Sequence, residues 1–180
     1  MGSSANWFIG LPVTGTWLKR VVQEAPADLR RFAEADLHLT VAFLGSCGED
    51  AARRAWAVET PGGPFKVGLG HLVPMGNPRR PSAVSAVLIP PDEVADFMGR
   101  HRVAMWDAAG ALHDARPPKP HCTVGRPPRR TSPEQRDAIM NWAQAQPPVQ
   151  VEVLLDRLAL YTGAEDRRTR RFRIVEERPL

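Results

Sequence analysis

The residues best suited to chemistry in this sequence are two histidines, each followed two positions later by a threonine. One pair lies in His38-Leu39-Thr40 and the other in His121-Cys122-Thr123. Because side chains alternate between the two faces of a strand, each histidine should share a face with its threonine, opposite the intervening apolar residue. Histidine can bind or release a proton near neutral pH. Two such segments that face each other could therefore supply a general base and a general acid.

The opening of a phosphodiester by water is a reaction that needs such a pair. One histidine would take a proton from the attacking water, and the other would give a proton to the leaving oxygen. The hydroxyls of Thr40 and Thr123 could donate to the nonbridging phosphate oxygens, and Arg126 could add a charge-assisted hydrogen bond. One histidine of this kind alone would be interpreted as a packed core residue. Two copies within apolar strands favour a shared site.

Length and charge limit the kind of protein. A chain of 180 residues fits one domain or two small lobes that share a core. The net charge is +4, and arginine forks suit phosphate, so the charge favours an anionic partner. A GC-rich genome is an alternative explanation of the arginine bias. The arginines crowd towards the C-terminus at Arg157, Arg167, Arg168, Arg170, Arg171 and Arg173.

Several classes of protein are disfavoured by what the sequence lacks. No apolar run is long enough to cross a membrane, and residues 1–6 lack the basic and apolar stretches of a secretory signal, so we expect a cytoplasmic protein. Cys47 and Cys122 have no partners at metal-ligand spacing, so we expect two reduced thiols and no structural metal. No pair of carboxylates suggests a glycosidase or a two-metal nuclease.

The expected elements mix strands and helices without a glycine-rich nucleotide-binding pattern. Apolar periodicity, turn residues and caps define them. A proline-rich loop is expected at 74–81. Strands are predicted at 7–13, 29–32, 37–44, 65–73, 83–89, 121–124, 149–161 and 169–175, and helices at 16–24, 50–59, 92–109 and 133–145.

With these motifs in place, the chain resembles the 2H phosphoesterase superfamily. Within it, the similarity is to the bacterial and archaeal RNA 2′,3′-cyclic phosphodiesterases once called 2′-5′ RNA ligases. Phe8–Pro12 is similar to the first strand of that family, Leu37–Gly45 to its first signature, Pro120–Arg126 to its second, and Arg178–Leu180 to its usual ending. The resemblance covers nearly the whole chain, and two signatures are more specific than one.

The resemblance implies both a fold and an activity. The implied fold is α+β, with two pseudo-symmetric lobes whose antiparallel sheets surround a central cleft, in a single bilobal domain over residues 1–180. The implied activity is hydrolysis of an RNA 2′,3′-cyclic phosphate to a 2′-phosphate without a metal or cofactor. His38 would be the proton donor to the departing 3′ oxygen, and His121 the acceptor that activates water. RNA ends or cyclic nucleotides would be the substrate, and we expect a monomer.

Some residues depart from the family pattern or allow more than one interpretation. Cys122 and Gly125 replace more typical residues, and Thr162 stands where a serine is common, which affects substrate contacts. Trp7, Phe8 and Phe43 are candidates to stack on a substrate base, although core packing is the favoured interpretation. The remaining histidines lack a threonine partner, so we expect no catalytic role for His71, His101 and His113.

Two other functions remain open at this point. The same site could serve a phosphodiesterase or ligase that acts on 2′-5′ linked or cyclic signalling oligonucleotides. Alternatively, the chain could be a non-catalytic nucleotide-binding module whose histidines only hold phosphate. Turnover of a cyclic nucleotide in the presence of a chelator separates these classes.

Overall fold

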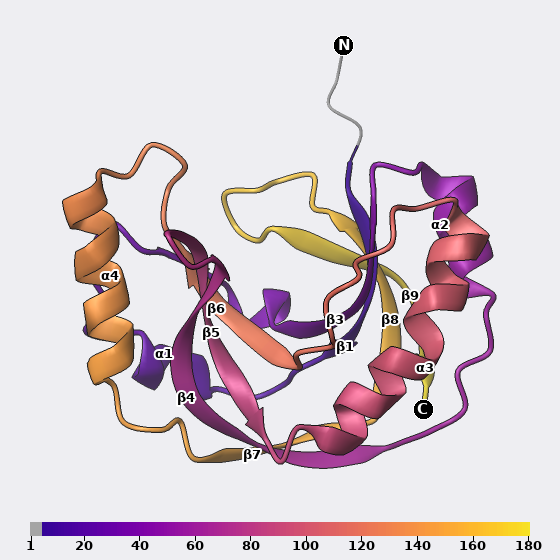
Figure 1. The fold of residues 1–180 in the computed structure, drawn as a ribbon, viewed down its shortest axis with the longest axis horizontal. Coiled ribbons are helices and arrows are strands. Elements are labelled where there is room, and N and C mark those ends of the chain that lie inside the picture. The colour runs from indigo at the N-terminus through magenta and orange to yellow at the C-terminus, as the bar shows by residue number, and fades with distance from the viewer. Residues whose placement is uncertain (1–4) are drawn as a thin grey trace.

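A computed structural model describes residues 5–180 of the chain, so most of the segment used to argue against a secretory signal lies outside the described residues. The described residues form two antiparallel sheets, and each sheet belongs to one lobe of an α+β fold (Figure 1). This arrangement confirms the predicted two-lobed α+β architecture.

The first lobe is built on a sheet in which strands from both ends of the chain are neighbours. Its order is β3-β1-β8-β9, with β1 at Trp7–Pro12, β3 at His38–Gly45, β8 at Arg157–Gly163 and β9 at Phe172–Pro179. Helices α2 (Glu49–Trp56) and α3 (Asp92–Ala109) pack against β1 and β3 respectively. The apolar stripe predicted for 92–109 is the buried face of α3.

The second lobe contains the other sheet, with α4 (Pro133–Ala145) packed against β4 and β5. Ser132 caps α4 by accepting a hydrogen bond from the backbone N–H of Gln135 at 3.2 Å, as the Ser-Pro pair predicts. Helix α1 (Trp17–Val21) is shorter than the predicted 16–24. The sheet order is β2-β6-β5-β4-β7, with β2 at Arg30–Arg31, β4 at Phe65–Asn77, β5 at Arg80–Ile89, β6 at His121–Arg126 and β7 at Val151–Leu155.

The two lobes meet where the two motif strands lie. Strand β3 is at the edge of the first sheet, and it contacts β6 of the second sheet. Fully buried Cys122 on β6 lies against the backbone of His38 on β3, and burial raises the pKa of its thiol to about 12. Cys122, which lies between the histidine and the threonine of the second motif, therefore forms part of the contact between the lobes.

The loop predicted at 74–81 is wrong. Strands β4 and β5 continue through this stretch and pair Pro74 with Val84 and Met75 with Ala83, leaving a tight turn between Asn77 and Arg80. Strand β7 pairs with β4 only between Phe65 and Leu69, so the far half of β4 has a free edge on that side. A proline is tolerated at such an edge, because its missing N–H breaks no ladder.

The single strand predicted at 149–161 is also wrong. It divides at Asp156 into β7, which belongs to the second sheet, and β8, which belongs to the first. Both halves are apolar enough for a strand, and periodicity contains no information about the sheet that each one joins. The last predicted strand begins later and runs further than expected, as β9.

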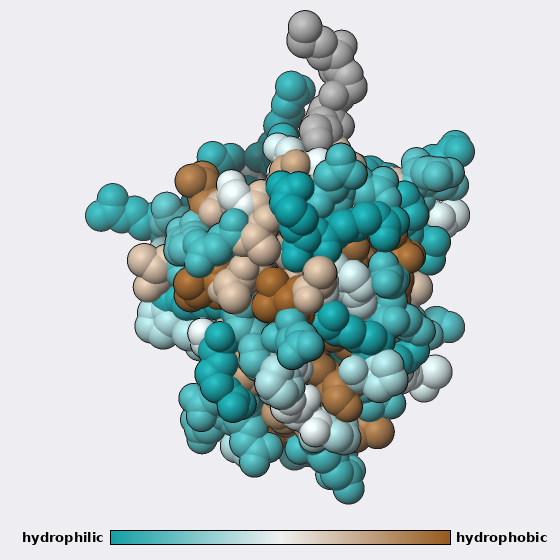
Figure 2. All heavy atoms as spheres, turned by 90° about the vertical axis from the view of Figure 1, so that its right-hand side faces the viewer, coloured by the Kyte–Doolittle hydropathy of each residue, from teal (hydrophilic) through white to brown (hydrophobic). Residues whose placement is uncertain are grey.

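The outer surface is mixed in character. Figure 2 shows the side of the molecule that carries α2 and α3, where most residues are hydrophilic and the hydrophobic ones are scattered in small groups. No helix within residues 5–180 is long and apolar enough to cross a membrane. Both cysteines are free thiols, as the sequence predicts.

Candidate active site

His38 begins β3, and its imidazole is oriented by the main chain. The ring Nδ1 donates to the backbone carbonyl oxygen of Asp36 at 2.6 Å, two residues earlier. A carbonyl oxygen can only accept, so Nδ1 holds the proton in the neutral ring. The other nitrogen, Nε2, has no hydrogen-bond partner among the described residues, and it is therefore free to accept or donate a proton.

His121 begins β6 and repeats this arrangement. Its Nδ1 donates to the backbone carbonyl oxygen of Lys119, again two residues earlier and again at 2.6 Å. The two motifs thus share a tautomer and an anchoring contact as well as a sequence pattern. Two unengaged Nε2 atoms, one from each lobe, are what paired acid–base chemistry requires.

The His38 ring lies within an aromatic cluster. Ring centroids of Phe8, Tyr161 and Phe172 are 4.6, 5.1 and 5.3 Å from the His38 centroid, and the Phe172 ring is perpendicular to it. Burial in this cluster lowers the pKa of His38 to about 4, against the raising effect of the Asp36 carbonyl and carboxylate. The unliganded protein therefore holds His38 neutral at pH 7.

The pKa values of His38 and His121 are both affected by the charge of Arg126. Burial also lowers the pKa of His121, against its bond to the Lys119 carbonyl, and the charges of Lys119 and Arg126 lower it further. Arg126 and His121 both lower the pKa of His38 as well. A negative charge placed near these groups would oppose the lowering effects of the positive charges.

The other predicted site residues are only partly brought together. Thr40, Phe43, His121 and Arg126 line one hollow of about 1460 Å³, whereas His38 and Thr123 do not line it. Phe43 is 53% exposed, so core packing is not the role of its ring, although Trp7 and Phe8 are buried. This places Phe43 where a substrate base could reach it.

Thr123 differs from the expectation for a phosphate donor. Its side chain is buried, and its Oγ1 lies 3.0 Å from the Oγ of fully buried Ser85 on the neighbouring strand β5. A hydroxyl is both a donor and an acceptor, so Thr123 can accept from Ser85 and still donate elsewhere. No sequence pattern indicated Ser85, because its contact with Thr123 crosses two strands.

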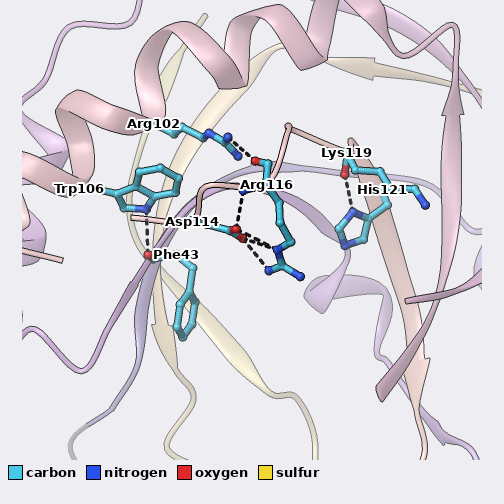
Figure 3. A network of polar contacts seen from close by, with 7 residues as sticks. All are labelled: Phe43, Arg102, Trp106, Asp114, Arg116, Lys119 and His121. Atoms are coloured by element: carbon cyan, nitrogen blue, oxygen red, sulfur yellow. Dashed lines mark hydrogen bonds and ion pairs between the residues drawn. The ribbon is translucent and has the colours of Figure 1, made fainter. Parts of the chain in front are cut away.

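The loop between α3 and β6 positions the Lys119 carbonyl. Figure 3 shows its polar contacts, in which Arg102 of α3 donates to the backbone carbonyl oxygen of Arg116 at 2.6 Å. Arg116 in turn pairs with Asp114, whose pKa its guanidinium lowers to about 2. Since α3 packs on β3, the contacts of this loop also link the anchor of His121 to the strand that carries His38.

Asp36 is a site residue that sequence reasoning missed. Its buried carboxylate accepts hydrogen bonds from the backbone N–H groups of Arg171 at 2.9 Å and of Phe172 at 3.0 Å. The same residue thus anchors His38 through its carbonyl and the start of β9 through its side chain. The one signal in the sequence was an acidic residue directly before an apolar strand, where a buried charge needs a partner.

Of the remaining histidines, His113 lines the same hollow as Thr40, Phe43 and His121, whereas His71 and His101 do not. His71 is exposed, His101 Nε2 contacts the Pro61 carbonyl oxygen, and His113 pairs with Asp107. Within residues 5–180, no group of three or more histidine, cysteine or acidic side chains is arranged to hold a metal ion. The residues best placed for acid–base chemistry are therefore those around the two motifs.

Comparisons with known proteins support the fold. No protein-family model and no curated protein matches the sequence. Among solved structures, Escherichia coli LigT complexed with 3′-AMP is 19% identical, with 98% of each chain covered and a TM-score of 0.67. LigT complexed with NADP⁺ is 20% identical, with 99% of each chain covered and a TM-score of 0.66. A protein of Thermus thermophilus is 19% identical over 97% of each chain, also with a TM-score of 0.66.

These similarities establish what class of fold surrounds the site. The chain has the two-lobed fold of LigT and of a solved phosphoesterase that is 19% identical over 98% of each chain, at a TM-score of 0.66. The fold that the resemblance implies is thereby confirmed. At this identity the likeness says nothing about which reaction the site performs.

Proposed function

We propose that this protein is a phosphodiesterase that hydrolyses the 2′,3′-cyclic phosphate at an RNA end to a 2′-phosphate, without a metal. The observation that carries the proposal is the matched anchoring of His38 and His121. Each Nδ1 is held by a main-chain carbonyl, so that each Nε2 is left for proton transfer. Two histidines can complete both proton transfers of a phosphodiester hydrolysis.

In the proposed reaction, water attacks phosphorus and gives a proton to Nε2 of His121. The bond from phosphorus to the 3′ oxygen breaks, and that oxygen takes a proton from Nε2 of His38. The products are a 2′-phosphate and a 3′-hydroxyl, and solvent returns both rings to their starting states. Thr40 and Arg126 stabilise the nonbridging oxygens, Thr123 assists through its hydroxyl, and the exposed Phe43 ring stacks on the terminal base.

The pKa of the proposed donor opposes its role, because a donor must hold a proton. His38, the proposed donor, has the pKa of about 4. A bound phosphate supplies the missing negative charge and raises the pKa of both rings. The effect is larger for His38, because its aromatic surroundings screen charge poorly. Substrate binding would then protonate the donor at the moment it is needed.

The nucleotide complexes of LigT support a nucleotide substrate, since that protein was solved with 3′-AMP, NADP⁺ and ATP. We further propose that residues 1–180 act as a single bilobal domain and as a monomer, because each lobe of one chain supplies one motif strand. A phosphodiesterase or ligase for 2′-5′ linked or cyclic signalling oligonucleotides would use the same residues, and no contact in the structure favours it.

The direct test is hydrolysis of 2′,3′-cyclic CMP and of a cyclic-ended oligoribonucleotide by protein kept in EDTA. We expect turnover, with the product phosphate at the 2′ position by ³¹P NMR. H38A and H121A should each lose about 10²–10⁴-fold in kcat. H71A, which changes an exposed histidine, is the matched control and should be fully active. Binding without turnover would leave a nucleotide-binding module, and a requirement for added metal would refute the mechanism.

The two roles can be assigned with a substrate whose 3′ bridging atom is sulfur. A thiolate leaves without taking a proton, so the proton donor is no longer needed for that substrate. We expect the sulfur substrate to restore the activity of H38A but not that of H121A. The opposite pattern would exchange the roles.

A further inference from the structure

A second hollow shares Arg126 with the hollow that Phe43 lines. Its volume is about 1090 Å³, and it spans both lobes, because Arg30 and Arg126 belong to the second sheet while Arg167 and Arg171 lie in the loop between β8 and β9. In Figure 1 this loop extends from the first lobe towards the second. Among the described residues that line the hollow, none is acidic, and its arginines are Arg30, Arg80, Arg126, Arg129, Arg136, Arg167 and Arg171.

These guanidinium groups lack carboxylate partners. The ion pairs formed within residues 5–180 involve none of the seven arginines. Asp36 does act on Arg171, but its oxygens are occupied by the backbone N–H groups of Arg171 and Phe172. Burial lowers the pKa of Arg171, and the charges of Arg30 and Arg167 lower it further, against the raising effect of Asp36. Unpaired like charges gathered in this way are stabilised by an anion.

The hollow adjoins the candidate active site at Arg126. Arg30 pairs with Arg126 across β2 and β6, and Arg126 lines both hollows. The guanidinium carbons of Arg171 and Arg126 lie 5.1 and 5.9 Å from the centre of the Phe32 ring. Phe172, which also lines the arginine hollow, lies edge-on to the His38 ring. An RNA strand whose end lies at the two histidines can therefore continue past Arg126 into the hollow that the arginines line.

We propose that Arg30, Arg167 and Arg171 form an upstream phosphate subsite, which binds an internal phosphate of the RNA strand whose cyclic end lies at His38 and His121. This inference rests on the proposed function. A cyclic phosphate has one negative charge, which Arg126 balances, so three further guanidiniums fit a substrate with additional phosphates. Guanidinium forks match phosphate oxygens in geometry as well as in charge. The preferred substrate is then an oligonucleotide end rather than a free cyclic mononucleotide.

The test compares one cyclic-ended pentaribonucleotide with the cyclic mononucleotide of the same terminal base. The double variant R30Q/R167Q removes two charges from the subsite. We expect its KM for the pentanucleotide to rise about tenfold for each guanidinium that is removed, with kcat little changed. Its kcat/KM for the mononucleotide should equal that of the unmodified protein. The slope of log KM against log salt for the pentanucleotide should decrease by about 0.7, the value for the loss of one phosphate contact on a single strand.

The matched control is R54Q/R100Q, which removes the same charge from exposed positions on α2 and α3. It should leave both substrates unaffected. Equal losses on both substrates, or no loss on either, would overturn the subsite. If no cyclic phosphate is hydrolysed, the proposed function fails by itself, and anisotropy of a labelled pentanucleotide with a 2′-phosphate end still decides the subsite. Salt-dependent binding that R30Q/R167Q weakens supports the subsite, and equal binding by both proteins overturns it.

Discussion

Replacement of Asp36 by alanine should destabilise the protein strongly, because its carboxylate anchors the start of β9. The change leaves the backbone N–H groups of Arg171 and Phe172 without their buried acceptor. Hydrogen bonds to a charged group contribute about 1.5–3 kcal/mol each, so D36A should lose about 3–6 kcal/mol. This is a large part of the ~5–15 kcal/mol by which domains are stable. The melting temperature should fall by on the order of 10–20 °C.

The assay is thermal unfolding of D36A, D36N and D96A, followed by circular dichroism. An asparagine side chain keeps one oxygen for one of the two N–H groups, so D36N should lose about half as much. Asp96 is exposed on α3, and D96A should melt like the unmodified protein. If D36A melts within about 2 °C of the unmodified protein, the carboxylate does not anchor β9 and the reasoning is refuted.

Three further outcomes are expected. Between pH 6.5 and about 4 the unfolded chain binds a proton at His38 that the folded chain does not. The free energy of unfolding should therefore decrease by at most about 3 kcal/mol as the pH is lowered through this window. In urea titrations, H38F should show a weaker dependence of this free energy on pH. S85A should lower kcat about fivefold because the Thr123 hydroxyl loses its partner, and an unchanged kcat would exclude this role. F43A should raise KM about 5–100-fold with little change in melting temperature, whereas a lower melting temperature at constant KM would mean that the ring only packs.

The parts of the fold that could be predicted depend on local patterns. The bounds of α3 follow from its apolar stripe, and the start of α4 follows from the Ser132–Pro133 cap. The assignment of strands to sheets could not be predicted, as the division at Asp156 shows, because the two apolar segments on either side have the same pattern. A proline at position 74 also looked like a loop signal, since the sequence does not reveal that one edge of β4 is free.

The candidate site shows the same limit. The His-x-Thr repeats predicted the positions of His38 and His121, because alternation along a strand is a local property. The contacts from Phe172 to His38 and from Arg171 to Asp36 join residues about 135 positions apart, and no local pattern indicates them. The burial of Thr123 against Ser85 was missed for the same reason.

The main-chain anchoring of the two rings has a consequence for how much sequence change the site tolerates. Every amino acid has the same backbone carbonyl, so the contact that orients His121 does not depend on the identity of residue 119. The orientation of the His121 ring is thus independent of the side chain at its anchor, provided that the backbone path is kept. A scaffold of this kind can accept substitutions at the anchoring positions without a change in the orientation of its imidazoles.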